Sequence, residues 1–224
     1  MWCLPPQQDA RFVAAMEDVL EVYARPYDAQ RPVVCLDEAA KQILAEVREP
    51  LPMSTKHGNL YDSEYERRGT CALFMLFEPL GAKRFVQVRE RRTALDYAQV
   101  VKWMCEELYP HANKIVLVQD NLNTHGPHSL YEAFAPEEAR HLVERIEWHY
   151  TPKHGSWLNM AELELSVLAR QCLVERMESQ ANLSHQVQTW QHRRNRTATR
   201  VDWQFTTQGA RTKLKRLYPY LLPG

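Results

Sequence analysis

The sequence predicts an α/β fold, in which helices alternate with the strands of a sheet. Two short apolar runs, 32–36 and 114–119, have the β-branched, unalternated composition of strands that are buried on both faces. A strand pair and a helical segment lie between them in the chain. The 224 residues, with 28 Lys and Arg against 28 Asp and Glu and 45% hydrophobic residues, fit one soluble globular domain. This composition excludes a disordered or collagen-like chain.

The first elements are a helix, a strand and a hairpin. Apolar residues recur at helical spacing over 9–23, and the Arg25-Pro26 pair ends that pattern. The strand over 32–36 follows and ends in a carboxylate. Further strands are expected over 70–77 and 83–89, and the Glu-Pro-Leu-Gly sequence between them has a turn composition, which predicts a hairpin.

The middle of the chain continues the alternation. A helix is expected over 93–108, where the helical pattern stops before Pro110, and the strand over 114–119 comes next. Two shorter helices over 129–134 and 136–144 lead to a strand over 145–150. The resulting order of strand, hairpin, helix, strand and helix is that of a sheet covered by helices.

The last part of the chain is predicted to be helical and is strongly basic. We expect helices over 159–178 and 184–196, followed by irregular sequence to Gly224. From Leu165 onwards there are ten Lys and Arg residues against three acidic residues. This excess of positive charge could lie along a polyanion, or it could be a solvated helical surface.

The sequence shows neither a membrane span nor a signal peptide. It has no run approaching the roughly 18 apolar residues of a membrane span, and no signal peptide at its start, so we expect a cytosolic protein without a membrane partner. The cysteines are odd in number and form no C-x-x-C pair, which argues against both a disulfide framework and a zinc knuckle. We expect reduced, mostly buried thiols at Cys3, Cys35, Cys71, Cys105 and Cys172.

Two carboxylates occupy equivalent places in the predicted sheet. Asp37 and Asp120 each follow an apolar run. If the two strands pair in parallel, their ends lie about 5 Å apart, at the edge where ligands bind such sheets. Two aspartates that close repel each other unless cations lie between them, and oxygen ligands of this kind suit Mg²⁺ or Mn²⁺. The alternative for either residue is a turn former or helix cap.

A third acid is expected on the helix over 159–178. Glu162 shares a helical stripe with Leu158 and Leu165, which predicts that it faces the core, whereas Glu164 is expected to face solvent. A carboxylate on a core-facing stripe needs a partner, and a metal ion would supply one. A buried salt bridge to an arginine is the alternative.

Four segments of the chain together resemble a known family. They are the strand-end Asp37, the segment Asp120-Asn121-Leu122-Asn123-Thr124-His125, the segment Gly155-Ser156-Trp157-Leu158-Asn159-Met160-Ala161-Glu162, and the closing residues 203–219. They are similar to the catalytic core of the DDE transposases of the mariner-like superfamily, in its bacterial insertion-sequence branch, and the resemblance runs from about Trp2 to Pro219. It implies a ribonuclease-H-like fold, a mixed central sheet flanked by helices, with Asp37, Asp120 and Glu162 as the metal-binding triad.

The resemblance also implies an organisation and an activity. We expect an N-terminal helix and linker over 1–31, the catalytic domain over 32–180, and a basic C-terminal helix and tail over 181–224. Family members usually carry an N-terminal helix-turn-helix region, and we expect this chain to be a catalytic domain without one. Its implied activity is transposition: two Mg²⁺ (or Mn²⁺) ions assist cleavage of a phosphodiester and then attack of the freed 3′-hydroxyl on target DNA.

The implied partners are double-stranded DNA, as transposon ends and as target, and a second copy of the chain in a homodimer on that DNA, in the bacterial cytosol. Two other functions stay open at this point. One is a stand-alone ribonuclease-H-like nuclease acting on RNA–DNA hybrids or DNA junctions. The other is a domesticated remnant that binds DNA or a protein without cutting.

Residues near the triad are candidates for supporting roles. Glu38 follows Asp37 and so faces the other side of its strand, where a structural role is expected. Asn121 and His125 flank Asp120 and could orient a ligand water or a substrate phosphate. Positions expected to contact DNA phosphates are Lys153, His154, Arg170, Arg193, Arg194, Arg196, Arg211, Lys213, Lys215 and Arg216.

Overall fold

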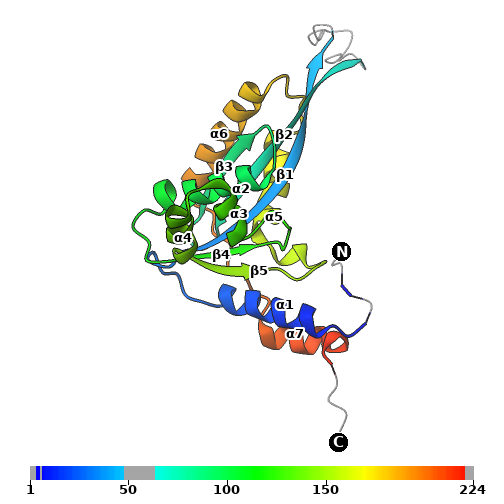
Figure 1. The fold of residues 1–224 in the computed structure, drawn as a ribbon. Helices are drawn as coiled ribbons and strands as arrows, with labels where there is room; N and C mark the ends of the chain where they lie inside the picture. Colours follow the sequence, from blue (N-terminus) through cyan, green and yellow to red (C-terminus); the bar gives the residue numbers. More distant parts are fainter. Residues whose placement is uncertain (1–3, 6, 48–63, 220–224) are drawn as a thin grey trace, which may run out of the picture.

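The computed structural model describes residues 4–5, 7–47 and 64–219, and it contains a five-stranded sheet of order β3-β2-β1-β4-β5 (Figure 1). The strands are β1 (Val33–Glu46), β2 (Tyr65–Glu78), β3 (Lys83–Arg89), β4 (Ile115–Gln119) and β5 (Ile146–Tyr150). β1, β2 and β3 pair antiparallel, whereas β4 lies parallel to both β1 and β5. The sheet is therefore mixed, as expected.

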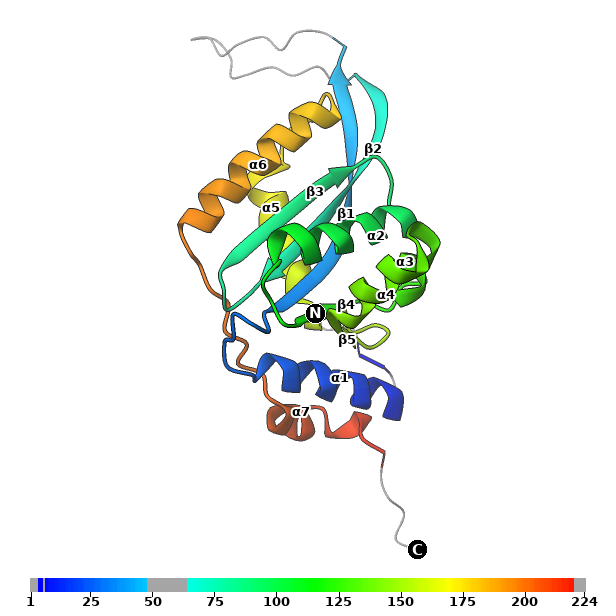
Figure 2. The same cartoon turned by 60° about the vertical axis from the view of Figure 1, so that its left-hand side comes forward.

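Helices cover both faces of the sheet (Figure 2). One hydrophobic cluster joins the sheet to α2, α3 and α4, and a second joins it to α1, α5, α6 and α7. The helices are α1 (Ala10–Tyr23), α2 (Ala94–Trp103), α3 (Pro127–Ala133), α4 (Pro136–Glu144), α5 (Met160–Cys172), α6 (Gln180–Arg196) and α7 (Thr207–Lys213), with a π-helical turn Met104–Leu108 and 3₁₀ turns Ser156–Leu158 and Lys215–Leu217.

The central strands are buried on both faces. In β1, Cys35 belongs to the cluster on the α5 side, whereas its neighbours Val34 and Leu36 belong to the cluster on the α2 side. In β4, Val116 and Leu117 divide between the faces in the same way. Since successive side chains point to opposite faces, such strands need apolar residues at every position, which is why their sequences do not alternate.

Helix starts follow from local capping. The Asp9 carboxylate accepts hydrogen bonds from the backbone N–H groups of Arg11 and Phe12, both at 3.0 Å, and so begins α1 where the pattern predicted. Thr93 and Asp96 form a reciprocal capping box at the start of α2. The predicted hairpin of β2 and β3 is also confirmed.

Several expectations about the bounds of elements were wrong. β2 begins at Tyr65 rather than at 70, and α6 begins at Gln180 rather than at 184. β1 does not end at Asp37 but runs on to Glu46, because its ladder with β2 continues after β4 has ended. α5 ends at Cys172 rather than at 178; there Lys41 donates to the Leu173 carbonyl at 2.7 Å. The tail also contains α7 and a 3₁₀ turn, and Ala210 of α7, Leu217 of the turn and Leu214 between them are buried in the core. The last positions of the predicted tail, 220–224, lie outside the described residues.

α6 runs along β3, the outer edge strand, and bonds to its backbone. The Asn195 side chain accepts from the Arg84 N–H and donates to the Arg84 carbonyl, both at 2.8 Å. One turn earlier, the Gln191 side chain accepts from the Val86 N–H at 2.8 Å. Side-chain amides of the helix thus occupy positions that a further strand would take in the ladder.

No helix in the described part of the chain is long and apolar enough to cross a membrane. Four cysteines have free thiols: Cys35, Cys71 and Cys105 are buried, and Cys172 is partly buried. This agrees with the predicted reduced state. Cys3 lies outside the described residues.

Candidate metal and nucleic-acid site

The sheet brings Asp37 and Asp120 to the same level. β1 and β4 are neighbours in parallel register, and the last pair of that ladder is Cys35 with Val118. Asp37 and Asp120 each lie two residues further along, so the register places them side by side where β4 ends. Both carboxylates are partly exposed at this edge. The predicted juxtaposition is therefore present, although β1 itself continues past it.

Glu162 lies in the first turn of α5, next to this pair. The Glu162 side chain is exposed, not core-facing, so the expected orientation was wrong. Its charge nevertheless reaches Asp37: the ionised Asp120 and Glu162 both raise the pKa of Asp37. The exposed position leaves Glu162 accessible to a ligand at the edge that the two aspartates share.

Burial and crowding disfavour the ionised form of Asp37. Its removal from water is the largest influence and, together with the neighbouring carboxylates, outweighs the hydrogen bond that the Glu38 N–H donates to Asp37 Oδ1 at 2.8 Å. The pKa of Asp37 rises from 3.8 to about 7 as a result. A divalent cation at this edge would offset both the burial cost and the repulsion between carboxylates.

His125 lies between Asp120 at the end of β4 and Glu38 on β1. Its Nδ1 contacts Asp120 Oδ1, and its Nε2 lies 3.3 Å from Glu38 Oε2. Burial lowers the pKa of His125, but the hydrogen bonds to Asp120 and Glu38 outweigh it and raise the pKa to about 9. The ring also stacks on Tyr97, with centroids 4.7 Å apart. The buried His125 ring thus contacts Asp120 and Glu38 at once, and the contact with Glu38 joins residues 87 positions apart, which the sequence does not reveal.

Glu164 was expected to face solvent, but its side chain is 3% exposed and accepts hydrogen bonds from two arginines. Its Oε1 accepts from Arg84 Nε at 2.9 Å and from Arg194 Nε at 2.8 Å. Arg84 is itself fully buried and also donates to the carbonyls of Ala82 and Thr199. The buried glutamate–arginine salt bridge considered for Glu162 is therefore made by Glu164.

The segment after Asp120 lines an open cavity of about 490 Å³. Asn121 is exposed there, next to Asp120, and Tyr150 at the end of β5 forms another wall. Lys153 and His154, in the loop between β5 and α5, are exposed. His154 has a positive φ of 66° in this tight loop.

The predicted DNA-contacting cations fall into two groups. Arg194 is held against Glu164, and both Nε and Nη2 of Arg211 donate to Glu17 at 2.8 Å. The others are exposed: Lys153, His154, Arg170, Arg193, Arg196, Lys213, Lys215 and Arg216. Two of the ten positions thus have carboxylate partners that compete with a phosphate, and Lys213 Nζ lies 5.8 Å from the centroid of the Phe205 ring.

Asn159 is a residue to which sequence reasoning gave no role. It is 1% exposed and caps α5: its Oδ1 accepts from the Ala161 N–H at 3.0 Å, and its Nδ2 donates to the Leu36 carbonyl at 2.8 Å. An asparagine followed three positions later by Glu162, directly before a helical pattern, is a recognisable cap signal.

The donor set suits a hard divalent cation. Asp37, Asp120 and Glu162 offer only carboxylate oxygens, which Mg²⁺ and Mn²⁺ prefer. In the conformation of residues 4–5, 7–47 and 64–219, no three His, Cys, Asp or Glu side chains are grouped closely enough to hold one ion. Strand register brings Asp37 and Asp120 together, and the exposed Glu162 lies in the first turn of α5.

Comparisons with known proteins agree with this picture. A family model described as DDE superfamily endonuclease matches residues 32–184. The chain is similar in structure to the Mos1 mariner paired end complex with Mn, with a TM-score of 0.54 and 14% identity over 88% of this chain and 60% of that chain. It is also similar to the mariner Mos1 paired end complex with Mg, with a TM-score of 0.54 and 14% identity over 97% of this chain and 66% of that chain. For the Mos1 Strand Transfer Complex the TM-score is 0.54 and the identity 14%, over 84% of this chain and 57% of that chain.

The extent of these similarities differs between the comparisons. The chain spans less than two thirds of the length of the Mos1 chains that it matches. Comparison with curated proteins gives no match. The structural similarity confirms the ribonuclease-H-like fold, with its mixed sheet between layers of helices.

Proposed function

Since this chain belongs to the family of DDE superfamily endonucleases, we propose that it is the catalytic domain of a DNA transposase. It would cleave DNA strands and transfer them for an insertion sequence of the bacterial branch of the mariner-like superfamily. The observation that supports this most directly is the register of β1 and β4, which places Asp37 and Asp120 side by side on neighbouring parallel strands. The charge of Glu162 also acts on Asp37. That edge is where sheets of this kind bind ligands.

In this proposal Asp37, Asp120 and Glu162 hold two Mg²⁺ or Mn²⁺ ions. The ions, when bound, supply Lewis acidity at the scissile phosphate. The chain's own residues fix the ligands: His125 holds the Asp120 carboxylate from one side, and the Glu38 N–H holds the Asp37 carboxylate from the other. Asn121, exposed beside Asp120, would face a DNA phosphate or a ligand water. The Mos1 complexes with Mn and with Mg agree with the proposed choice of metal.

The proposed partners are the two DNA substrates and a second copy of the chain. Exposed cations of the tail and of the loop before α5 would contact the phosphate backbone of transposon ends and target DNA. The Mos1 neighbours are a paired end complex and a strand transfer complex, which supports a DNA partner. We propose a homodimer on DNA in the bacterial cytosol.

Plasmid cleavage tests the proposal. The chain should nick supercoiled plasmid in the presence of Mg²⁺ or Mn²⁺ but not in EDTA, and Asp120→Ala should lack this activity. Joining of a 3′-hydroxyl end to target DNA would distinguish a transposase from a nuclease of the same fold. Absence of any metal-dependent cleavage by the folded chain would contradict the proposal.

Metal binding should be visible in stability. Mg²⁺ or Mn²⁺ should raise the melting temperature of the chain, because an ion that binds only the folded state stabilises it. Asp37→Asn should raise the melting temperature of the metal-free chain, because it removes a partly buried charge next to other carboxylates, and it should abolish the response to metal. An unchanged metal-induced shift in both Asp37→Asn and Asp120→Asn would refute the joint site.

DNA binding should depend on salt through the exposed tail. Arg216→Gln should flatten the plot of log affinity against log salt by about 0.9 if Arg216 neutralises one phosphate of duplex DNA. Arg211→Gln is the matched control and should have a smaller effect, because Glu17 already partly neutralises Arg211. Fluorescence anisotropy at several salt concentrations measures both slopes. Equal slopes for Arg216→Gln and the unaltered chain would show that Arg216 does not contact a DNA phosphate.

A further inference from the structure

We propose that Asn159 is a positioning residue, which fixes the spacing between the helix that carries Glu162 and the strand that carries Asp37. The inference rests on the proposed function, because it concerns the metal site of that function. Asn159 lies three residues before Glu162, and its bonding partner Leu36 lies one residue before Asp37. One buried side chain therefore spans the two elements next to both carboxylates.

The two hydrogen bonds of Asn159 require both ends of a carboxamide. Its oxygen accepts from the Ala161 N–H at 3.0 Å and so caps α5, while its nitrogen donates to the Leu36 carbonyl at 2.8 Å and so ties the cap to β1. Ser or Asp can cap a helix equally well. Asp has no donor for the Leu36 carbonyl, and Ser is too short to span both partners. The residue thus does more than begin the helix.

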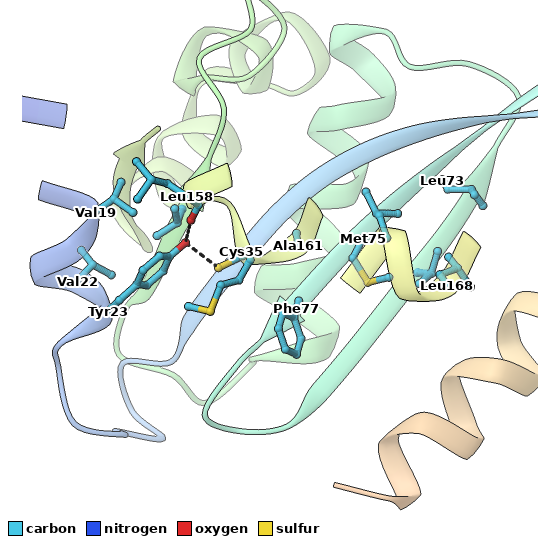
Figure 3. Packing of buried hydrophobic residues seen from close by; sticks show 14 of the residues in the cluster. Val19, Val22, Tyr23, Cys35, Leu73, Met75, Phe77, Leu158, Ala161 and Leu168 are labelled. Atoms are coloured by element: carbon cyan, nitrogen blue, oxygen red, sulfur yellow. Dashed lines mark hydrogen bonds between the residues drawn. The ribbon is translucent and has the colours of Figure 1, made fainter. Parts of the chain in front are cut away.

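A second contact holds the neighbouring residue. The Tyr23 hydroxyl donates to the Leu158 carbonyl at 2.7 Å, and it lies 3.4 Å from Cys35 Sγ on β1 (Figure 3). Tyr23 and Asn159 therefore attach the start of α5 to α1 and to β1 from adjacent positions. These bonds act on the first turn of α5, which carries Glu162, whereas the packing of Leu165 and Leu168 on the sheet acts further along the helix.

Metal affinity provides a readout that a purely structural role would not change. In the full chain, Asn159→Ser keeps a helix cap but loses the bond to Leu36, and it should weaken Mn²⁺ binding about 10- to 100-fold, the range seen when residues that orient metal ligands are removed. Isothermal titration with Mn²⁺ measures the affinity. Nicking by the variant should show a lowered kcat at an unchanged affinity for DNA.

Asn195→Ser is the matched control. It is the same substitution at another asparagine whose side-chain amide both accepts from and donates to strand or helix backbone, but the strand it contacts is β3, two strands away from β1. Its Mn²⁺ affinity should equal that of the unaltered chain. A similar loss of affinity in Asn195→Ser and Asn159→Ser would overturn the inference, because general destabilisation would then explain both.

If Asn159→Ser does not fold, Asn159→Asp serves instead, since it keeps the size and the cap. Its added negative charge should by itself attract Mn²⁺, so weakened binding can only come from the lost tie to Leu36. Unchanged or tighter binding in a folded Asn159 variant overturns the inference but leaves the proposed function intact. A chain that binds no Mn²⁺ at all overturns both.

Discussion

Glu162→Gln is expected to reduce metal-dependent DNA cleavage by about 10²- to 10³-fold or more, because loss of a metal ligand removes several kcal/mol of charge stabilisation from the reaction. The Glu162 side chain is exposed, so the free energy of unfolding should change by no more than about 0.5 kcal/mol. Plasmid nicking and urea unfolding of the same preparation measure the two effects.

The control for Glu162→Gln is Glu175→Gln, the same substitution at another exposed acid just after α5. It should leave the cleavage rate unchanged. Full activity in Glu162→Gln would show that Glu162 is not a metal ligand. The proposed site would then consist of Asp37 and Asp120 alone.

Glu164→Gln is expected to lower the free energy of unfolding by about 3–5 kcal/mol, the usual cost of removing one partner from a buried ion pair. The reason is Arg84, which is fully buried and would keep its charge without the carboxylate that faces it. Arg194 has the same acceptor but is partly exposed and can recover contact with water. Chemical denaturation measures the change.

A paired substitution separates charge from packing at this position. Arg84→Met combined with Glu164→Leu should be more stable than Glu164→Gln alone, because no unpaired charge remains buried between β3 and α5. If Glu164→Gln instead unfolds like the unaltered chain and loses cleavage, Glu164 rather than Glu162 would be the third acid.

Much of the fold could be predicted because its signals are local. Apolar runs ending in Asp37 and Asp120 identify two central strands, and strand pairing in parallel then brings the acids together without further information. Capping residues such as Asp9 and Thr93 fix the helix starts within the sequence of each helix. The end of β1 was missed because residues 38–46 pair with β2 residues that lie 19 to 36 positions further along the chain.

The orientation of α5 could not be predicted, for two physical reasons. Leu158 was counted in its apolar stripe, but Leu158 lies in a separate 3₁₀ turn and Asn159 interrupts the helical backbone after it. The stripe that is buried contains Ala161, Leu165 and Leu168 together with a charged residue, Glu164. A charge is tolerated there only because Arg84 and Arg194 arrive from β3 and α6, and local periodicity carries no trace of those partners.

The amides of α6 that bond to β3 also bear on how the protein behaves at high concentration. An open edge strand is a template on which another chain can add as a strand, and such addition leads to aggregates. Here Gln191 and Asn195 already occupy the Val86 and Arg84 positions of that edge. An incoming strand would have to displace a 17-residue helix before it could pair, so this side of the sheet is protected from self-association.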